Sequence, residues 1–562
     1  MPKRLWMVGL SSLVAAACSS SPGTQPPLAP CTATSGGQVS LGIGAYAVID
    51  PTQTAGCAVF AANLLGSTIE YLVVPQSATT IPDDSQAFKL GGNPLAAPPA
   101  PGAPLAAAFG PNVAQQFDLR LRLSERELAA QVPRPLRAPP RAPALVTPVD
   151  SGHVRTFKVC NTLQCDPRKP TTLSTVTATA LKVGAHIAIY VDNAAPQPGL
   201  SQTDLDNLRS VFDTRLYETD TLAFGGESDI DNNGMVIVLM TGKVNALVSS
   251  AKCATSGYVA GYFFGADLVT TPPFATGNNG EVFYSIVPDP SGTLSCSHSV
   301  TGVSQVVPVT FVHEFQHMIS FNQHFLIRGQ FPEDLWLNEG LSHYAEENGG
   351  RTFLPDSGTF CRYVFGDLYN SAQYFSAPQN YFLVDTAGIG GLANRGAYWL
   401  FVRYLVDQVG ATLGSADSVT RRLDRTALIG AANVSNAAGG IAFPTVLARW
   451  ALANYVSDLP AFTAPPELQY VTWKFRADYQ TMKNTCAAFF STGSLPSQFP
   501  LTPAIVDGSA AQLAGMLRAG SGSYYQLQHP PAAPGFTLLF SNSAGGALRT
   551  SLVPRLNVIR IQ

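Results

Sequence analysis

The stretch VVPVTFVHEFQHMISFN, residues 306–322, places His313, Glu314 and His317 in one largely apolar run. The three residues form the pattern HExxH. In a helix, side chains four positions apart lie one turn apart on the same face, so both histidines can reach one metal ion. The glutamate between them can accept a proton from a water molecule that the metal holds. The stretch therefore predicts a metal-binding helix, with an ordinary helix carrying two histidines as the alternative.

A third metal ligand is expected in WLNEGLSHYAEE, residues 336–347. Catalytic zinc takes three protein ligands and keeps one position open. Glu339 lies on a second segment with apolar periodicity. The loop between this segment and the HExxH helix can bring the two helices face to face. His313, His317 and Glu339 are therefore the predicted zinc ligands, and Glu314 remains free to act as the catalytic base.

HEFQHMI and WLNEGLSHYAE together resemble the thermolysin-type zinc peptidases with a glutamate third ligand, the gluzincins. Most specifically they resemble the hyicolysin-like bacterial neutral metalloproteases, and the likeness covers roughly residues 154–410. The resemblance implies an exported, zinc-dependent peptidase with a gluzincin catalytic domain.

The sequence departs from this pattern at His343, where thermolysin has an acidic residue that orients a zinc-binding histidine. Either Glu346 or Glu347 takes that role, or His343 has another one. The plain alternative for His343 is a residue on the helix surface. Tyr398, in GAYWLFVRYL, is a catalytic candidate because related enzymes place a tyrosine in a later helix to stabilise the developing oxyanion. Packing in the core is its plain alternative.

A second cation site is considered in SDIDNNG, residues 228–234. Asp229, Asp231 and Asn233 alternate before a glycine, and calcium prefers clustered oxygen ligands of this kind. A simple turn before the next strand explains the same residues, so calcium and a turn both stay open.

The N-terminus predicts export. Residues 1–17 have a charged start and a short apolar core typical of a signal peptide. The following Cys18 resembles the acylated cysteine of bacterial lipoproteins, with 18–30 as a tether. We therefore expect an outer-membrane or cell-surface lipoprotein, or otherwise a secreted protein. A net charge of −3 and the lack of a basic cluster give no case for a nucleic-acid partner.

The fold class predicted is α+β, with the catalytic domain at 151–495 between two small β-rich domains at 31–93 and 496–562. A proline-rich linker region is expected at 94–150. Within the catalytic domain, alternating segments predict strands, and LSQTDLDNLRSVFDTRLY, residues 200–217, predicts a helix capped by Ser201. EVFYSIV, residues 281–287, is expected to be an edge strand that pairs with extended substrate.

Eight cysteines remain after Cys18, which suits disulfides in an exported chain. They allow about 105 connectivities. Pairing sequence neighbours gives Cys31–Cys57, Cys160–Cys165 and Cys253–Cys296, which leaves Cys361 with Cys486.

These observations predict a zinc metalloendopeptidase that acts on protein or peptide substrates. Aminopeptidase activity ranks second, because no motif for capturing a free substrate amine is found. The rival from another class is a surface binding or adhesion protein that keeps the metallopeptidase fold without turnover.

Overall fold

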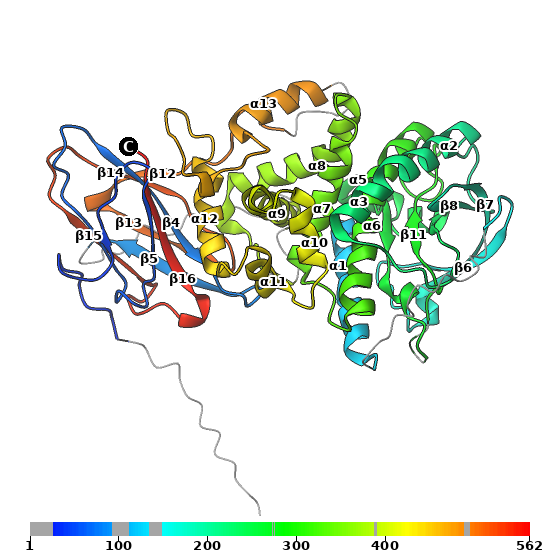
Figure 1. Cartoon of the computed structure of the whole chain (residues 1–562), viewed down its shortest axis with the longest axis horizontal. Coiled ribbons are helices and arrows are strands. Elements are labelled where there is room, and N and C mark those ends of the chain that lie inside the picture. Colours follow the sequence, from blue (N-terminus) through cyan, green and yellow to red (C-terminus); the bar gives the residue numbers. More distant parts are fainter. Residues whose placement is uncertain are drawn as a thin grey trace, which may run out of the picture.

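The computed structural model describes residues 26–92, 112–133, 149–272, 274, 276–386, 391–487 and 495–562. The expected signal peptide, Cys18, most of the tether, and residues 94–111 and 134–148 of the expected linker region lie outside these residues. Figure 1 shows a β-sandwich at one end, a helical middle and a six-stranded sheet at the other end. This is a mixed α+β architecture, as the sequence predicts.

The β-sandwich is built from both ends of the chain. One sheet has the order β1-β3-β15-β5-β13 and the other β12-β14-β4-β16-β2, so early and late strands alternate. A single apolar core lies between the sheets and includes Phe60, Val73, Leu538 and Val558. The strands are β1 Gln38–Val39, β2 Tyr46–Ile49, β3 Cys57–Phe60, β4 Ile69–Ser77, β5 Ser85–Gly91, β12 Ala504–Asp507, β13 Gln512–Arg518, β14 Tyr525–His529, β15 Phe536–Asn542 and β16 Pro554–Arg560.

The prediction of two separate β-rich domains at 31–93 and 496–562 is therefore wrong. The strands themselves are present in both segments, but each segment supplies only part of two shared sheets. In β4, for example, the neighbours are β14 and β16 on its two sides. Neither segment can satisfy the backbone hydrogen bonds of its own strands alone, which is why they combine.

The six-stranded sheet has the order β10-β11-β9-β8-β7-β6. Its β8, β9 and β11 run parallel, and the remaining neighbours pair antiparallel. The short β10 lies at the edge, so the expectation that 281–287 forms the edge strand is wrong, because β11 is paired on both sides. The strands are β6 Val154–Cys160, β7 Leu173–Val183, β8 Ile187–Asp192, β9 Val236–Met240, β10 Gly261–Phe263 and β11 Val282–Ser285.

Helices fill the middle of the molecule and cover the six-stranded sheet. The predicted cap at Ser201 is present: its side chain accepts from Asp204 N, and the Asp204 side chain accepts in return. The helices are α1 Val113–Gln131, α2 Gln202–Val211, α3 Tyr217–Phe224, α4 Gly242–Asn245, α5 Ser250–Ser256, α6 Val300–Phe321, α7 Leu335–Arg351, α8 Ser357–Ser376, α9 Leu392–Leu413, α10 Ala416–Asp424, α11 Gly430–Ala437, α12 Phe443–Val456 and α13 Phe475–Cys486.

Helix α1 lies within the segment predicted to be a linker, 94–150, and it packs against the rest of the protein. Its Val113, Phe117, Leu121 and Leu128 are buried in the same core as the six-stranded sheet. Only the residues on either side of α1 remain as expected linker, and most of them lie outside the described part of the chain.

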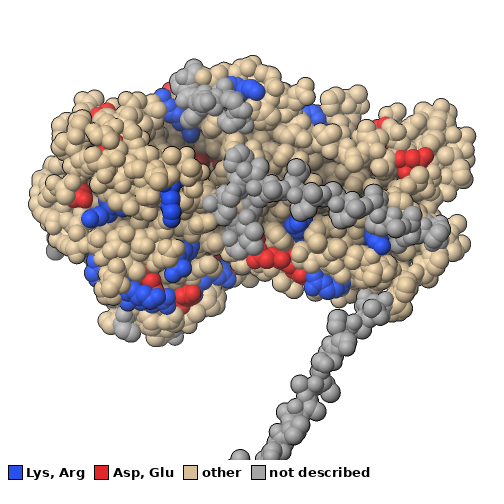
Figure 2. Space-filling model, turned by 180° about the vertical axis from the view of Figure 1, so that it is seen from behind, with Lys and Arg blue, Asp and Glu red and all other residues tan. Residues whose placement is uncertain are grey.

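All four disulfide pairings suggested by the sequence are present: Cys31–Cys57, Cys160–Cys165, Cys253–Cys296 and Cys361–Cys486. Among the described residues no helix is long and apolar enough to cross a membrane. On the face drawn in Figure 2, acidic and basic residues form small groups on a mostly uncharged surface.

Candidate metal centre

The HExxH residues lie in the C-terminal half of α6, which begins at its cap Ser299 and is buried from Phe311 onward. The rings of His313 and His317 meet edge to face, with centroids 4.9 Å apart. One turn of helix separates them, so both rings point to the same side, as the spacing predicts.

Glu339 comes from α7, which packs against α6. Its Oε1 lies 3.3 Å from His317 Nε2 and its Oε2 lies 3.9 Å from His313 Nε2. Gly340 follows at the contact between α7 and α9, where a Cβ atom would lie 2.8 Å from the Tyr398 carbonyl oxygen. A glycine there lets the two helices approach closely and holds Glu339 against both histidines.

These three residues fit a metal ion. Their ligand atoms all lie within 4.8 Å of one another. Glu339 is only 2% exposed, yet neither carboxylate oxygen has a well-directed hydrogen bond among the described residues. Arg395 Nη2, 3.2 Å from Oε2, compensates part of the charge of this buried carboxylate, and a metal ion beside the two imidazoles would compensate the rest. Two imidazoles and one carboxylate are the donor set of catalytic zinc.

A carboxylate orients His313. The Nδ1 atom of His313 lies 2.7 Å from Glu346 Oε1, which directs Nε2 toward Glu339. Such a partner fixes the tautomer of a metal ligand and raises its basicity. Of the two glutamates considered for this role, Glu346 is the one in contact, whereas Glu347 pairs with Arg351 and Arg403.

His343 is buried, so it is not a residue of the helix surface. Its Nδ1 lies 3.2 Å from Glu346 Oε1 and 2.9 Å from Asp367 Oδ1. Burial lowers the pKa of His343, but these two carboxylates outweigh it and raise the pKa to about 10. His343 is therefore a cation whose ion pair with Glu346 stabilises the position of that carboxylate.

Glu314 is 6% exposed and lies next to the histidine pair. Its Oε2 accepts a hydrogen bond of 2.8 Å from Phe263 N at the end of β10. Burial raises the pKa of Glu314 to about 7. A carboxylate with a pKa near the working pH is suited to accept a proton and return it.

No known protein-family model matches this chain. The chain is similar to the neutral metalloprotease ShpI of Staphylococcus hyicus, with 32% identity over 145 residues. The alignment covers 25% of this chain and 30% of that protein, so it spans less than a third of the relative. The similarity supports a relationship to metalloproteases and nothing finer.

Tyr398 lies in α9 beside the centre, but its hydroxyl group donates to the Asp385 carboxylate. A phenol has one proton to donate, so in this arrangement Tyr398 does not point a free donor at the centre. Arg395, one turn earlier on α9, is closer to the ligands: its Nη2 lies 3.2 Å from Glu339 Oε2. Arg395 was not among the residues predicted for the site, because nothing in its own segment indicates that its side chain reaches Glu339.

The SDIDNNG loop brings Asp229 and Asp231 together with Glu281, which precedes β11, and the three could hold a metal ion. Asn233 is not part of this group, because its Oδ1 accepts from Met235 N. The Glu281 carboxylate accepts hydrogen bonds from Ser228 Oγ and Ile230 N. Asp231 forms an ion pair with Arg155 at 2.9 Å. The loop therefore has features of both the calcium site and the turn.

Proposed function

We propose that this protein is a zinc-dependent metalloendopeptidase. The observation that carries the proposal is the convergence of His313, His317 and Glu339 on one point, with Glu314 beside them on the same helix. The similarity to a neutral metalloprotease supports the same reaction class.

Zinc held by these three residues would polarise the scissile carbonyl and acidify a water molecule. Glu314 accepts the proton of the attacking water and passes it to the leaving amine. Glu346 keeps the His313 ring in position. Arg395, whose Nη2 lies 3.2 Å from Glu339 Oε2, can stabilise negative charge that develops on the substrate, whereas Tyr398 would first have to leave Asp385.

We further propose that the protein works outside the cytoplasm, since four disulfides are formed and such bonds persist in oxidising compartments. A lipid anchor at Cys18 remains a proposal from the sequence. The finer placement in the hyicolysin-like group and a calcium ion at Asp229, Asp231 and Glu281 are likewise proposals.

The test is hydrolysis of unfolded casein by the purified protein and by Glu314→Gln, with bound zinc measured in both. We expect both to hold about one zinc and the variant to lose activity by about 100- to 10,000-fold. Zinc in both without cleavage by either would favour the binding or adhesion protein or a latent precursor. Absence of zinc would refute the metal centre.

A second substrate separates the two peptidase classes. An endopeptidase cleaves a peptide whose N-terminus is acetylated, whereas an aminopeptidase needs the free amine. We expect internal cleavage of the acetylated peptide, and cleavage of only the unblocked peptide would favour the aminopeptidase.

A further inference from the structure

Helix α1 lies across the candidate metal centre. A cavity of ≈ 220 Å³ is lined on one side by Ala114, Phe117 and Asp118 of α1 and on the other by His313 and Glu314. In Figure 1, α1 stands beside α6 and α7, between the six-stranded sheet and the helical part of the molecule.

On the sheet side, α1 uses backbone groups at the end of the edge strand β10. Arg122 Nη2 donates to Phe263 O at 2.7 Å, and Glu125 Oε1 accepts from Gly265 N at 2.7 Å. The Phe117 ring meets Tyr262 edge-on, with centroids 5.1 Å apart. Helix α1 therefore occupies polar backbone groups that an added peptide strand would require.

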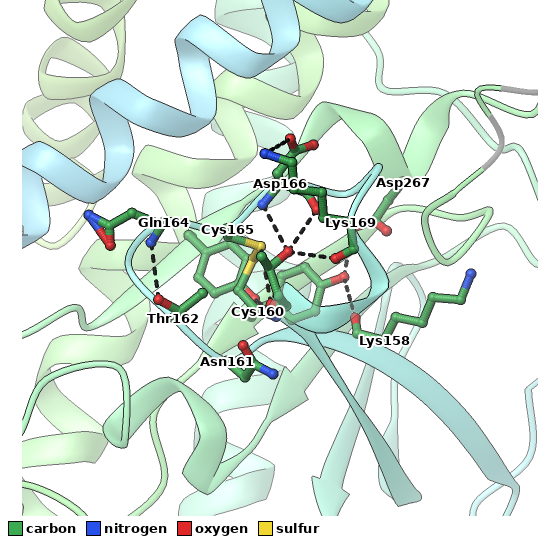
Figure 3. Close-up of a disulfide and its surroundings, with 12 residues drawn as sticks. Lys158, Cys160, Asn161, Thr162, Gln164, Cys165, Asp166, Lys169 and Asp267 are labelled. Carbon is green, nitrogen blue, oxygen red and sulfur yellow. Dashed lines mark hydrogen bonds and ion pairs between the residues drawn. A yellow bond between two sulfur atoms is a disulfide. The ribbon is translucent and has the colours of Figure 1, made fainter.

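A loop closed by a disulfide also touches α1 on this side. The bond Cys160–Cys165 lies at the end of β6, with Asp166 beside it and Lys169 reaching back to Asp166 (Figure 3). Arg168 of this loop lies 2.9 Å from Glu127 of α1. Both side chains are partly exposed, so this contact adds little to the attachment of α1.

On the helical side, α1 reaches a residue that also contacts the predicted zinc ligand. Asp118 Oδ2 lies 3.0 Å from Arg395 Nη2, and the same nitrogen lies 3.2 Å from Glu339 Oε2. Further along, Arg126 Nη1 pairs with Asp334 Oδ1 at 2.9 Å, just before α7 begins. The helix thus bridges the two sides of the molecule directly over the centre.

With α1 in place, His313 and Glu314 are 7% and 6% exposed, and His317 and Glu339 are 0% and 2% exposed. A polypeptide substrate has to bring its backbone to these residues. We propose that α1 is an inhibitory segment of this chain that occupies the peptide-binding surface and must be displaced before substrate binds. The inference rests on the proposed peptidase function.

The test compares Arg126→Asp with Arg120→Asp in the full-length, zinc-loaded protein. Both change the same residue type on α1, but Arg126 is paired with Asp334 whereas Arg120 is exposed. Arg126→Asp places two carboxylates together and weakens the attachment, without touching the metal centre. We expect it to raise the hydrolysis of a short peptide by about 2- to 5-fold, because the pair it breaks is partly exposed, and Arg120→Asp to leave it unchanged.

The second readout does not depend on turnover. Deuterium exchange of residues 113–131 is measured in the parent, with and without an N-acetylated peptide hydroxamate that binds zinc and extends along the cleft. We expect hydroxamate binding to accelerate exchange in α1, because both cannot occupy the surface, and Arg126→Asp to bind the hydroxamate more tightly.

If the hydroxamate binds while exchange in α1 stays the same or slows, α1 is a permanent wall of the cleft and the inference is wrong, whether or not peptide is cleaved. Accelerated exchange in a protein whose variants never cleave peptide would support the inhibitory contact and refute the peptidase proposal. A protein that holds no zinc overturns both.

Discussion

Replacing Glu346 by glutamine tests the geometry of the metal centre more sharply than removing a ligand does. The substitution keeps the size of the side chain and removes the charge that faces His313 Nδ1 at 2.7 Å. Loss of such a partner lowers metal affinity or activity by about 10- to 100-fold. That range corresponds to about 1.4–2.7 kcal/mol of zinc-binding free energy.

The neighbours of Glu346 favour the upper part of this range. His343 lies 3.2 Å from the same carboxylate oxygen, and the two charges hold each other in place. The His343 cation depresses the pKa of Glu346 to about 2 against the opposing effect of burial. In the variant, His343 keeps its ion pair with Asp367, and the His313 ring is held by a weaker, neutral hydrogen bond.

The assay is competition for zinc with a chromogenic chelator at fixed pH, with Glu218→Gln as the matched control. Glu218 is an exposed glutamate on α3, away from the centre. Far-ultraviolet circular dichroism checks that both variants fold. A Glu346→Gln protein that binds zinc within about twofold of the parent would refute the assigned role, because the loss expected is at least tenfold.

Three further predictions concern stability. Glu347→Gln should lower the free energy of unfolding by about 3–5 kcal/mol in urea titrations, because a buried carboxylate that pairs with Arg351 and Arg403 loses its charge; an unchanged midpoint would contradict this. Loss of Cys361–Cys486, by alanine at both positions, should cost about 2–5 kcal/mol, and an unaltered melting temperature would argue against a structural role for that bond. Burial raises the pKa of Glu281 from 4.5 to about 8, so the folded state keeps a proton that the unfolded chain has lost. Stability should therefore fall as the pH rises from 4.5 to 8, by at most about 1.4 kcal/mol per pH unit. Glu281→Gln should flatten this slope, and calcium chloride should counteract it in the parent; equal slopes without calcium would show that Glu281 is already ionised in the folded protein.

The arrangement of the candidate metal centre could be predicted from sequence because its parts are local. The spacing of His313 and His317 fixes their common face within one helix, and Glu339 follows on the next long helix. The sequence left two glutamates as candidates for the carboxylate that orients His313. Only the packing of α7 distinguishes them, because Glu346 faces α6 whereas Glu347 faces Arg403. Arg395 was missed because nothing in its own segment indicates that α9 crosses α7 at Gly340.

The sequence of α1 contains a helical pattern, although the proline-rich segments on both sides led to the prediction of a linker. Val113, Phe117 and Leu121 recur at helical spacing, and Asn112 caps the helix through Ala114 N. Its position over the candidate metal centre, by contrast, could not be predicted from the sequence of the helix. That position depends on contacts with Phe263, Asp334 and Arg395, which lie 141 to 277 residues beyond their partners in α1, and no local pattern specifies such partners.

The shared sandwich has a consequence for the order in which this protein can be made. The last N-terminal strand, β5, ends at Gly91, whereas the first C-terminal strand, β12, begins at Ala504. At about 5–20 residues per second on the ribosome, the strands made first wait for about 20–80 s before their partners are synthesised. Throughout that interval their edges are unpaired and able to join other chains. We therefore expect this end of the molecule to need protection during synthesis and to close last, although its first strands are among the first parts of the chain to emerge.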